Sequence, residues 1–217
     1  FGATIGAMFK PSDLITIGAS VRLPSKIKLS GDADMPGAAI LGLSGTSELE
    51  REVTWPIWAG VGVAVRPMDG LTITADAQYS QWGDLDKIGI DYTDPLWQAF
   101  FGTGLEMALA WKNTVQWRFG AEYWLNQGLA LRAGYYYDPA PGPLTHLNIL
   151  LPSPDGGWLT VGLGVKTPKF NIDFNVEYNV FGKDRVADLA GVFANTAMPG
   201  THGAGILSVG FAFTLNL

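Results

Sequence analysis

The sequence FNIDFNVEYN, from Phe170 to Asn179, alternates one apolar residue with one polar residue at every step. Side chains that alternate in this way point to opposite faces of a β-strand, so the period predicts a strand with one apolar and one polar face. An average globular strand has about 5–6 residues, whereas a tilted strand that crosses a bilayer needs about 9–11. The length of this segment therefore favours a membrane-crossing strand.

The same period recurs along the whole chain. Clear copies occupy residues 71–80, 115–123, 129–138 and 207–217, and weaker copies occupy residues 3–9, 15–23, 57–65 and 159–165. Together they predict about nine strands, most of them ten to twelve residues long.

The connections between these segments alternate between short and long. The short ones, at residues 10–13, 67–70, 126–128 and 167–169, contain the proline, glycine, aspartate and asparagine residues that are typical of hairpin turns. The long ones cover about residues 24–54, 83–113, 138–157 and 182–203. Outer-membrane barrels have short periplasmic turns and long external loops. The sequence therefore predicts an all-β fold, a transmembrane antiparallel up-and-down β-barrel.

Aromatic residues gather near the ends of the predicted strands. Those expected at the long-loop end are Trp58, Tyr79, Trp82, Tyr135, Tyr137 and Tyr178. Such residues are typical of the aromatic girdle at a membrane interface.

Composition excludes several other classes of protein. Hydrophobic residues make up 47% of the 217 residues and charged residues only 16%. The longest apolar stretch, residues 99–111, has only thirteen residues and is interrupted by Glu106. A spanning helix needs about 20 apolar residues, so helical membrane proteins are excluded. The chain has no cysteine, which excludes disulfide scaffolds and thiol catalysis. Its net charge of −6 argues against a nucleic-acid partner.

No motif indicates catalysis or a metal. The two histidines, His146 and His202, fall in predicted loops without a third ligand nearby, and Asp32-Ala33-Asp34 lacks the bidentate glutamate of a calcium loop. No motif brings together a nucleophile, a base and an orienting acid. We therefore expect no enzyme activity, no cofactor and no metal site.

The polar face of the predicted strands carries charges of both signs. These charges are Arg22, Arg66, Asp76, Arg118, Glu122, Arg132, Lys166, Asp173 and Glu177. Charges confined in a lumen are expected to pair across strands, because an unpaired charge there is costly. Alternatively, an arginine such as Arg118 or Arg132 binds the anionic head group of a ligand.

Two of the long loops are unusually apolar. The first contributes Ile40, Leu41 and Leu43, and the second contributes Trp97, Phe100 and Phe101. Apolar loop surfaces either pack together as a roof over the barrel or form an interaction site, and both interpretations remain open. With Arg118 and Arg132, these six residues are the candidate ligand-binding residues.

Several stretches resemble the FadL/TodX family of outer-membrane transporters for long-chain fatty acids and aromatic hydrocarbons. They include GAMFKP at residues 6–11, LTITAD at 71–76, YSQW at 79–82, FGAEY at 119–123, LRAGYYYDP at 131–139, LPSPD at 151–155 and DFNVEY at 173–178. The resemblance implies a fourteen-stranded barrel with an N-terminal hatch, so that the nine strands would be the last nine. It also implies an external groove partly on residues 24–54, a lumenal pocket and a lateral opening. The hatch and the early strands have no counterpart here, and the chain finishes at Leu217 where such barrels commonly finish in an aromatic residue.

The resemblance and the apolar loops together predict passive uptake of hydrophobic small molecules, either long-chain fatty acids or aromatic hydrocarbons. The alternatives are a general diffusion porin and a surface adhesin or phage receptor. The expected location is the outer membrane of a Gram-negative bacterium, with membrane lipids and lipopolysaccharide around a monomeric barrel.

Overall fold

A computed structural model describes residues 1–102, 107–143, 146, 156–179, 185–187, 200–202 and 205–216. The predicted connections at 138–157 and 182–203 therefore lie largely outside the described residues. None of the described helices is long and apolar enough to span a membrane.

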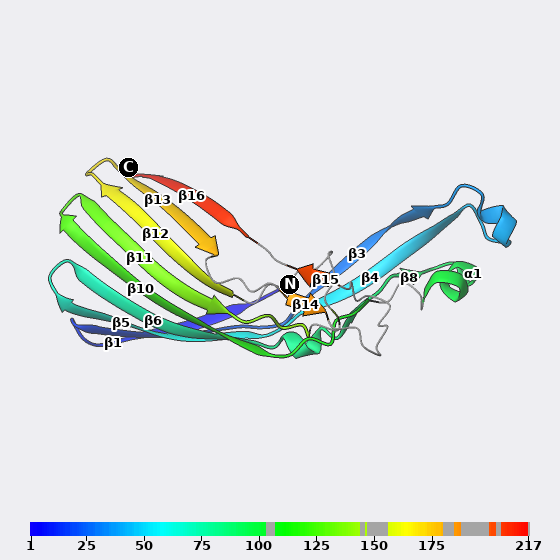
Figure 1. Cartoon of the computed structure of the whole chain (residues 1–217), viewed down its shortest axis with the longest axis horizontal. Helices are drawn as coiled ribbons and strands as arrows, with labels where there is room; N and C mark the ends of the chain where they lie inside the picture. Colours follow the sequence, from blue (N-terminus) through cyan, green and yellow to red (C-terminus); the bar gives the residue numbers. More distant parts are fainter. Residues whose placement is uncertain are drawn as a thin grey trace.

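Nine long strands form one curved antiparallel sheet (Figure 1). In spatial order they are β1 (Thr4–Ser12), β2 (Ile15–Arg22), β5 (Trp58–Met68), β6 (Leu71–Ser80), β10 (Thr114–Asn126), β11 (Leu129–Asp138), β12 (Gly156–Lys166), β13 (Phe170–Asn179) and β16 (Leu207–Leu215). Each strand pairs with the long strand that precedes it in the chain, which is the up-and-down order. The structure thus confirms the nine predicted strands and the antiparallel all-β fold.

One face of this sheet is apolar and exposed. Its residues include Val61, Ile73, Trp117, Phe119, Leu131, Val161, Leu163, Val209 and Phe211, all at least 40% exposed. The buried hydrophobic residues of the described chain are few: Ala38, Leu43, Leu85, Trp97, Leu109, Ala130 and Trp158. Water would disfavour so large an apolar surface, whereas acyl chains would cover it at no such cost. The sheet is therefore built to face lipid.

Tight turns join the strands at one end of the sheet. Residues 13–14, 69–70, 127–128 and 167–169 connect the strand pairs β1–β2, β5–β6, β10–β11 and β12–β13. Gly70 has φ +78, in the left-handed region, and a Cβ there would lie 3.0 Å from the carbonyl oxygen of Trp124. Only glycine fits this turn without strain.

The connection at 24–54 is a β-hairpin rather than an irregular loop. Strands β3 (Ser25–Asp34) and β4 (Thr46–Trp55) pair along their whole length, and β8 (Asp91–Tyr92) adds to the β4 side. Figure 1 shows this hairpin projecting beyond the loop end of the main sheet. We call β3, β4 and the segment from Asp91 to Gly102 the arm.

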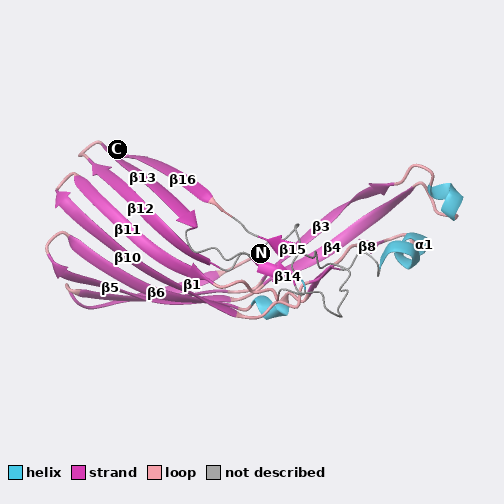
Figure 2. Ribbon diagram, in the orientation of Figure 1, coloured by secondary structure: helices cyan, strands magenta, loops and turns pink. Residues whose placement is uncertain are grey.

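The shorter elements lie in the long connections. They are η1 (Ala38–Leu41), η2 (Trp82–Asp84), β7 (Lys87–Ile88), α1 (Pro95–Trp97), η3 (Gln98–Gly102), β9 (Met107–Ala108), β14 (Arg185–Ala187) and β15 (Gly200–His202). The helical segments are confined to the loop end of the sheet and the far end of the arm (Figure 2).

Candidate functional site

A small hydrophobic core holds the far end of the arm together. Ala38, Leu43 and Trp97 are buried there, and Tyr92 and Phe101 pack against them. The ring centre of Trp97 lies 5.5 Å from that of Tyr92 and 5.6 Å from that of Phe101. Since Leu43 is 5% exposed and Trp97 2% exposed, these two predicted ligand-binding residues serve as the core of the tip.

Hydrogen bonds around Asp94 join the two loops at this core. Ser44 Oγ donates to Asp94 Oδ2 at 2.7 Å, and Trp97 Nε1 donates to the carbonyl oxygen of Ser44 at 2.9 Å. Asp94 Oδ1 also accepts from the backbone N–H of Leu96 at 2.8 Å and so caps α1, which begins at Pro95. The hydrogen bond from Ser44, followed by the one from Leu96, lowers the pKa of Asp94 below its ordinary value.

Four large apolar side chains are exposed on the short helices of the tip. Ile40 is 90% exposed and Phe100 56% exposed, and Leu41 and Leu96 are also exposed. Phe101 is half-buried, and its ring centre lies 6.1 Å from that of Phe100. We call Ile40, Leu41, Leu96 and Phe100 the tip patch. Three of the predicted residues, Ile40, Leu41 and Phe100, are thus available to a ligand at the surface, and Phe101 is partly available.

The polar face of the main sheet is hollowed where its residues are small. A hollow of about 630 Å³ lies over β1, β2, β5, β6 and β10, and its floor includes Gly18, Gly62 and Ala64. A second hollow of about 330 Å³ lies between Arg118 and Arg132 and is floored by Gly120 and Gly134. Cavities of about 300–1,000 Å³ suit small-molecule ligands.

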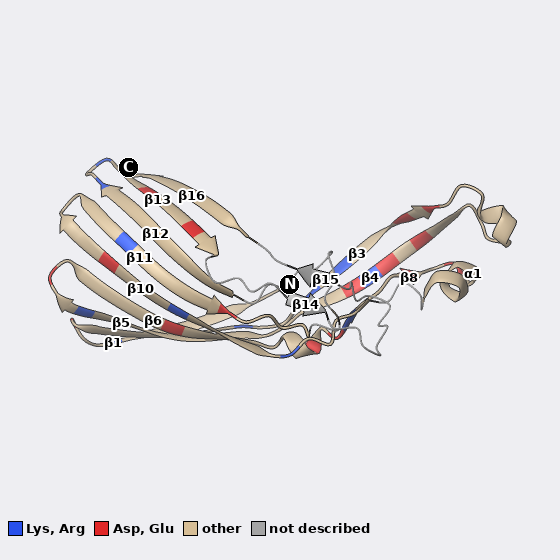
Figure 3. Ribbon diagram, in the orientation of Figure 1, with Lys and Arg blue, Asp and Glu red and all other residues tan. Residues whose placement is uncertain are grey.

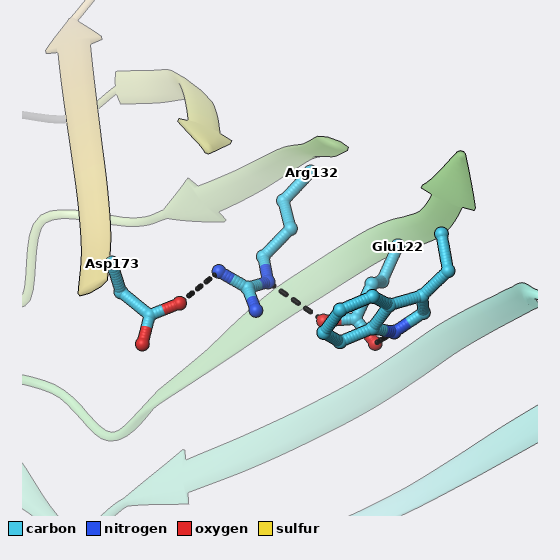
Figure 4. Close-up of polar contacts among 4 residues, drawn as sticks. Glu122, Arg132 and Asp173 are labelled. Carbon is cyan, nitrogen blue, oxygen red and sulfur yellow. Dashed lines mark hydrogen bonds and ion pairs between the residues drawn. The ribbon is translucent and has the colours of Figure 1, made fainter. Parts of the chain in front are cut away.

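Both predicted arginines on the polar face are held in ion pairs. Arg118 Nε lies 2.5 Å from Asp76 Oδ1 on the neighbouring strand. Arg132 lies between Glu122 and Asp173, at 2.7 Å and 2.6 Å from their carboxylate oxygens (Figure 4). Trp124 Nε1 donates to the other oxygen of Glu122 at 2.8 Å. These contacts confirm the expected pairing of charges across strands, and Figure 3 shows charges of both signs on the neighbouring strands.

Tryptophans form a cluster at the loop end of the sheet. The ring of Trp82 packs edge-on against those of Trp55, Trp58 and Trp111, with ring centres 5.3–6.1 Å apart. Trp58 shares the polar face with the hollow, because it alternates with the apolar-face residues Val61 and Val63. The prediction that Trp58 belongs to a lipid-facing girdle is therefore wrong, since its position in β5 turns it inward.

Sequence reasoning missed the residues that organise the arm. In β3, Lys26 and Lys28 alternate with Ile27 and Leu29, and β4 carries glutamates at alternate positions 48, 50 and 52. The structure pairs Lys26 with Glu52 at 2.6 Å and Lys28 with Glu50 at 2.9 Å. This complementary alternation was the available signal for a hairpin.

Within the described ranges, no group of three or more histidine or acidic side chains is placed to hold a metal ion. His146 and His202 lie far apart in sequence, and the side chain of His202 is outside what the structure describes.

The chain is similar in sequence to a family of outer membrane proteins. The family described as "Outer membrane protein transport protein (OMPP1/FadL/TodX)" matches residues 1–214. Outer membrane protein P1 of Haemophilus influenzae is 30% identical over 111 residues, which are 51% of this chain and 23% of that protein.

Solved structures share the fold. A FadL homologue of Pseudomonas aeruginosa superposes with a TM-score of 0.75 at 20% identity, over 98% of this chain and 50% of that chain. The toluene transporter TodX of P. putida gives a TM-score of 0.58 at 17% identity, over 82% of this chain and 42% of that chain. The chain thus spans about half the length of the first of these barrels.

The family match covers nearly the whole chain, and the lipid-facing antiparallel sheet agrees with the barrels of that family. The chain is therefore an outer-membrane β-barrel protein and belongs to the OMPP1/FadL/TodX family of outer membrane transport proteins.

Proposed function

We propose that this protein takes up hydrophobic small molecules passively across the outer membrane of a Gram-negative bacterium. The observation that carries the proposal is the tip patch, which exposes Ile40, Leu41, Leu96 and Phe100 around a packed core at the far end of the arm (Figure 1). In our proposal the long connections lie outside the cell, so the arm meets ligands first. Long-chain fatty acids and aromatic hydrocarbons are the ligand classes that we expect.

Burial of apolar surface makes the free energy of ligand binding at the tip favourable. Each Å² of apolar area removed from water is worth about 25 cal/mol. The patch is already ordered, because Trp97 and Leu43 are buried beneath it and Asp94 and Ser44 fix the two loops together. A preorganised surface loses little entropy on binding.

The hollows of the polar face are the proposed lumenal pocket. In our proposal a ligand that leaves the arm enters the 630 Å³ hollow, whose surface is mostly apolar although the ion pair of Asp76 and Arg118 is part of its lining. Diffusion down a concentration gradient through such sites needs no energy source, which is the passive mechanism that we propose.

Binding to the intact protein tests the role of the tip. A fluorescent long-chain fatty acid should bind the unmodified protein saturably in detergent, and the double variant Ile40→Ser/Phe100→Ser should bind it about tenfold more weakly. The control is Ile27→Ser/Leu29→Ser, which removes exposed apolar side chains from the β3 shaft of the arm and should leave affinity unchanged. Equal loss in both variants, or no saturable binding at all, would contradict the proposal.

The charged polar face also favours a second candidate, a general diffusion porin for polar solutes. A porin predicts substantial ion conductance in planar bilayers, unaffected by saturating fatty acid. Our first proposal predicts low conductance together with equilibration of the fatty acid across protein-containing liposomes without any energy source.

A further inference from the structure

Strand β3 is an exposed edge of the arm. It pairs with β4 on one side, and no strand that the structure describes pairs with its other side. Every residue from Lys26 to Asp32 is exposed, and so is Asp34. A free edge presents a row of backbone N–H and C=O groups, so a further strand can add to it by hydrogen bonding.

The charges of β3 are divided along its length. On one face the strand carries Lys26 and Lys28 near its start, Ser30 in the middle, and Asp32 and Asp34 at its end. These side chains share a face because alternate residues of a strand point the same way. Figure 3 shows the resulting division of β3, with blue near its start and red toward its end.

An antiparallel copy of β3 centred on Ser30 would set every charge opposite a charge of the other sign. With Ser30 opposite the partner's Ser30, Lys26 lies opposite the partner's Asp34. Lys28 lies opposite the partner's Asp32 in the same register. Because the arrangement is two-fold symmetric, each copy gives two lysines and two aspartates to these cross-strand pairs.

Other pairings of β3 are less favourable. A parallel copy in register would set lysine against lysine and aspartate against aspartate, and like charges directly opposite each other destabilise a sheet. An antiparallel copy slipped by two residues would keep only half of the charge pairs. Lysines on an edge usually prevent strand addition, so the aspartates at the other end of β3 make a second β3 the strand that fits.

The acidic end of β3 also lacks a cation within one copy. The two lysines already lie 2.6 and 2.9 Å from glutamates of β4. Asp32, in contrast, lies directly opposite Glu48, and neither Asp32 nor Asp34 forms an ion pair with a cation that the structure describes. The lysines of a partner would relieve the repulsion between Asp32 and Glu48.

We propose that β3 is a self-association strand through which two copies of this chain join their arms into one antiparallel sheet. The arm projects beyond the loop end of the main sheet (Figure 1), and the paired strands run in opposite directions. The two barrels therefore lie at opposite ends of the joined arms, so the contact connects facing membranes. This pairing departs from the monomer expected from the sequence and does not depend on the proposed uptake.

Complementary charge variants of the intact protein test the pairing in detergent. Asp32→Lys/Asp34→Lys makes the charges of β3 wholly positive, and Lys26→Glu/Lys28→Glu makes them wholly negative. Each variant alone should dimerise about tenfold more weakly than the unmodified protein in analytical ultracentrifugation. An equimolar mixture should regain dimerisation, because the same register then sets lysine opposite an acid at every charged position. Raising the salt concentration should weaken both dimers.

Ser30→Cys gives a measurement that leaves the charges of β3 unchanged. The chain has no cysteine, and in the proposed register the two introduced thiols lie opposite each other. Antiparallel pairing places such Cα atoms about 4.5–5.5 Å apart, which a disulfide can span. Mild oxidation should therefore give a covalent dimer. The control is Thr54→Cys, which is exposed on β4 away from the free edge and should stay monomeric.

Vesicles test the arrangement of the membranes. Phospholipid vesicles that contain the unmodified protein should cluster and scatter more light, whereas vesicles that contain either charge variant alone should not. Absence of clustering by a protein that dimerises in detergent would overturn the connection of facing membranes.

Three results would overturn the pairing itself. They are an unmodified protein that stays monomeric at about 100 μM, a mixture no more dimeric than its two components, and equal cross-linking of Ser30→Cys and Thr54→Cys. Each of them leaves the proposed uptake untouched, since uptake is measured by ligand binding to single barrels.

Discussion

Arg132 holds three strands of the barrel wall together through its single guanidinium. It bridges Glu122 on β10 and Asp173 on β13 from its own position on β11. The sequence predicted that these charges would share a face and pair. It did not predict which carboxylates pair with which arginine, because Arg132 and Asp173 are 41 residues apart and only the strand register brings them together.

Arg132→Leu should destabilise the barrel, because it leaves two carboxylates side by side without a cation. We expect a loss of about 1–3 kcal/mol in the free energy of unfolding, the usual cost of leaving a partly buried polar group without its hydrogen-bond partner. The measurement is urea unfolding in lipid vesicles. The exposed pair of Lys28 and Glu50 provides the control, since Lys28→Gln should cost less than about 1 kcal/mol. Equal costs for the two variants would contradict the structural role of Arg132.

Asp94 makes the tip of the arm sensitive to acid. Its pKa is lowered below 3.8 in the folded arm, so its contribution to stability is complete above about pH 5 and is lost as pH falls through the lowered folded value. The fluorescence of Trp97, taken as the difference between the unmodified protein and Trp97→Phe because the chain has 8 tryptophans, should stay constant from pH 7 to about pH 5 and change only in stronger acid. Asp94→Asn, which keeps the cap but cannot titrate, should remove that change. An unaltered acid transition in Asp94→Asn would assign it to other carboxylates.

At the scale of elements, the nine strands were predictable and the arm was not. Alternation located β6, β11 and β13 at 71–80, 129–138 and 170–179, because membrane and lumen impose opposite polarity on successive residues. In β3 the alternation of lysine with apolar residues covers only residues 26–29, so the period there is a weaker signal. The sequence pointed to the apolar residues of the tip as candidates. It did not show that Leu43 and Trp97 are buried, because their burial depends on how two loops that are distant in the sequence pack together.

The β5–β6 turn provides the test at this scale. Gly70→Ala places a Cβ 3.0 Å from the Trp124 carbonyl oxygen in a backbone with φ +78, so folding should become less favourable by about 1–2 kcal/mol. Gly45→Ala is the control, because no atom lies within 4 Å of a Cβ at that position. The yield of folded barrel, read from its heat-modifiable migration in gels, separates the two. Equal yields would contradict the turn geometry.

At the scale of the whole molecule, a charged side chain should be costly on the apolar face of the sheet and tolerated on its hollowed polar face. Val161 is 59% exposed near the middle of β12, so Val161→Arg should cost about 2–4 kcal/mol in a bilayer. Ser208→Arg, on the polar face of β16 opposite Glu177, should cost little. Folding titrations into vesicles measure both costs, and a penalty at Ser208 as large as that at Val161 would reverse the assignment of the two faces.

Single cysteines placed along β12 test the central claim most directly, because the chain has no cysteine of its own. In lipid vesicles, cysteines at positions 159, 161 and 163 should resist a water-soluble maleimide, whereas those at 160 and 162 should react. This alternation is expected because the first three side chains face acyl chains and the other two face the hydrated polar side. Reactivity without a period of two, or greatest at Leu159, Val161 and Leu163, would contradict the barrel wall from which the uptake route is derived.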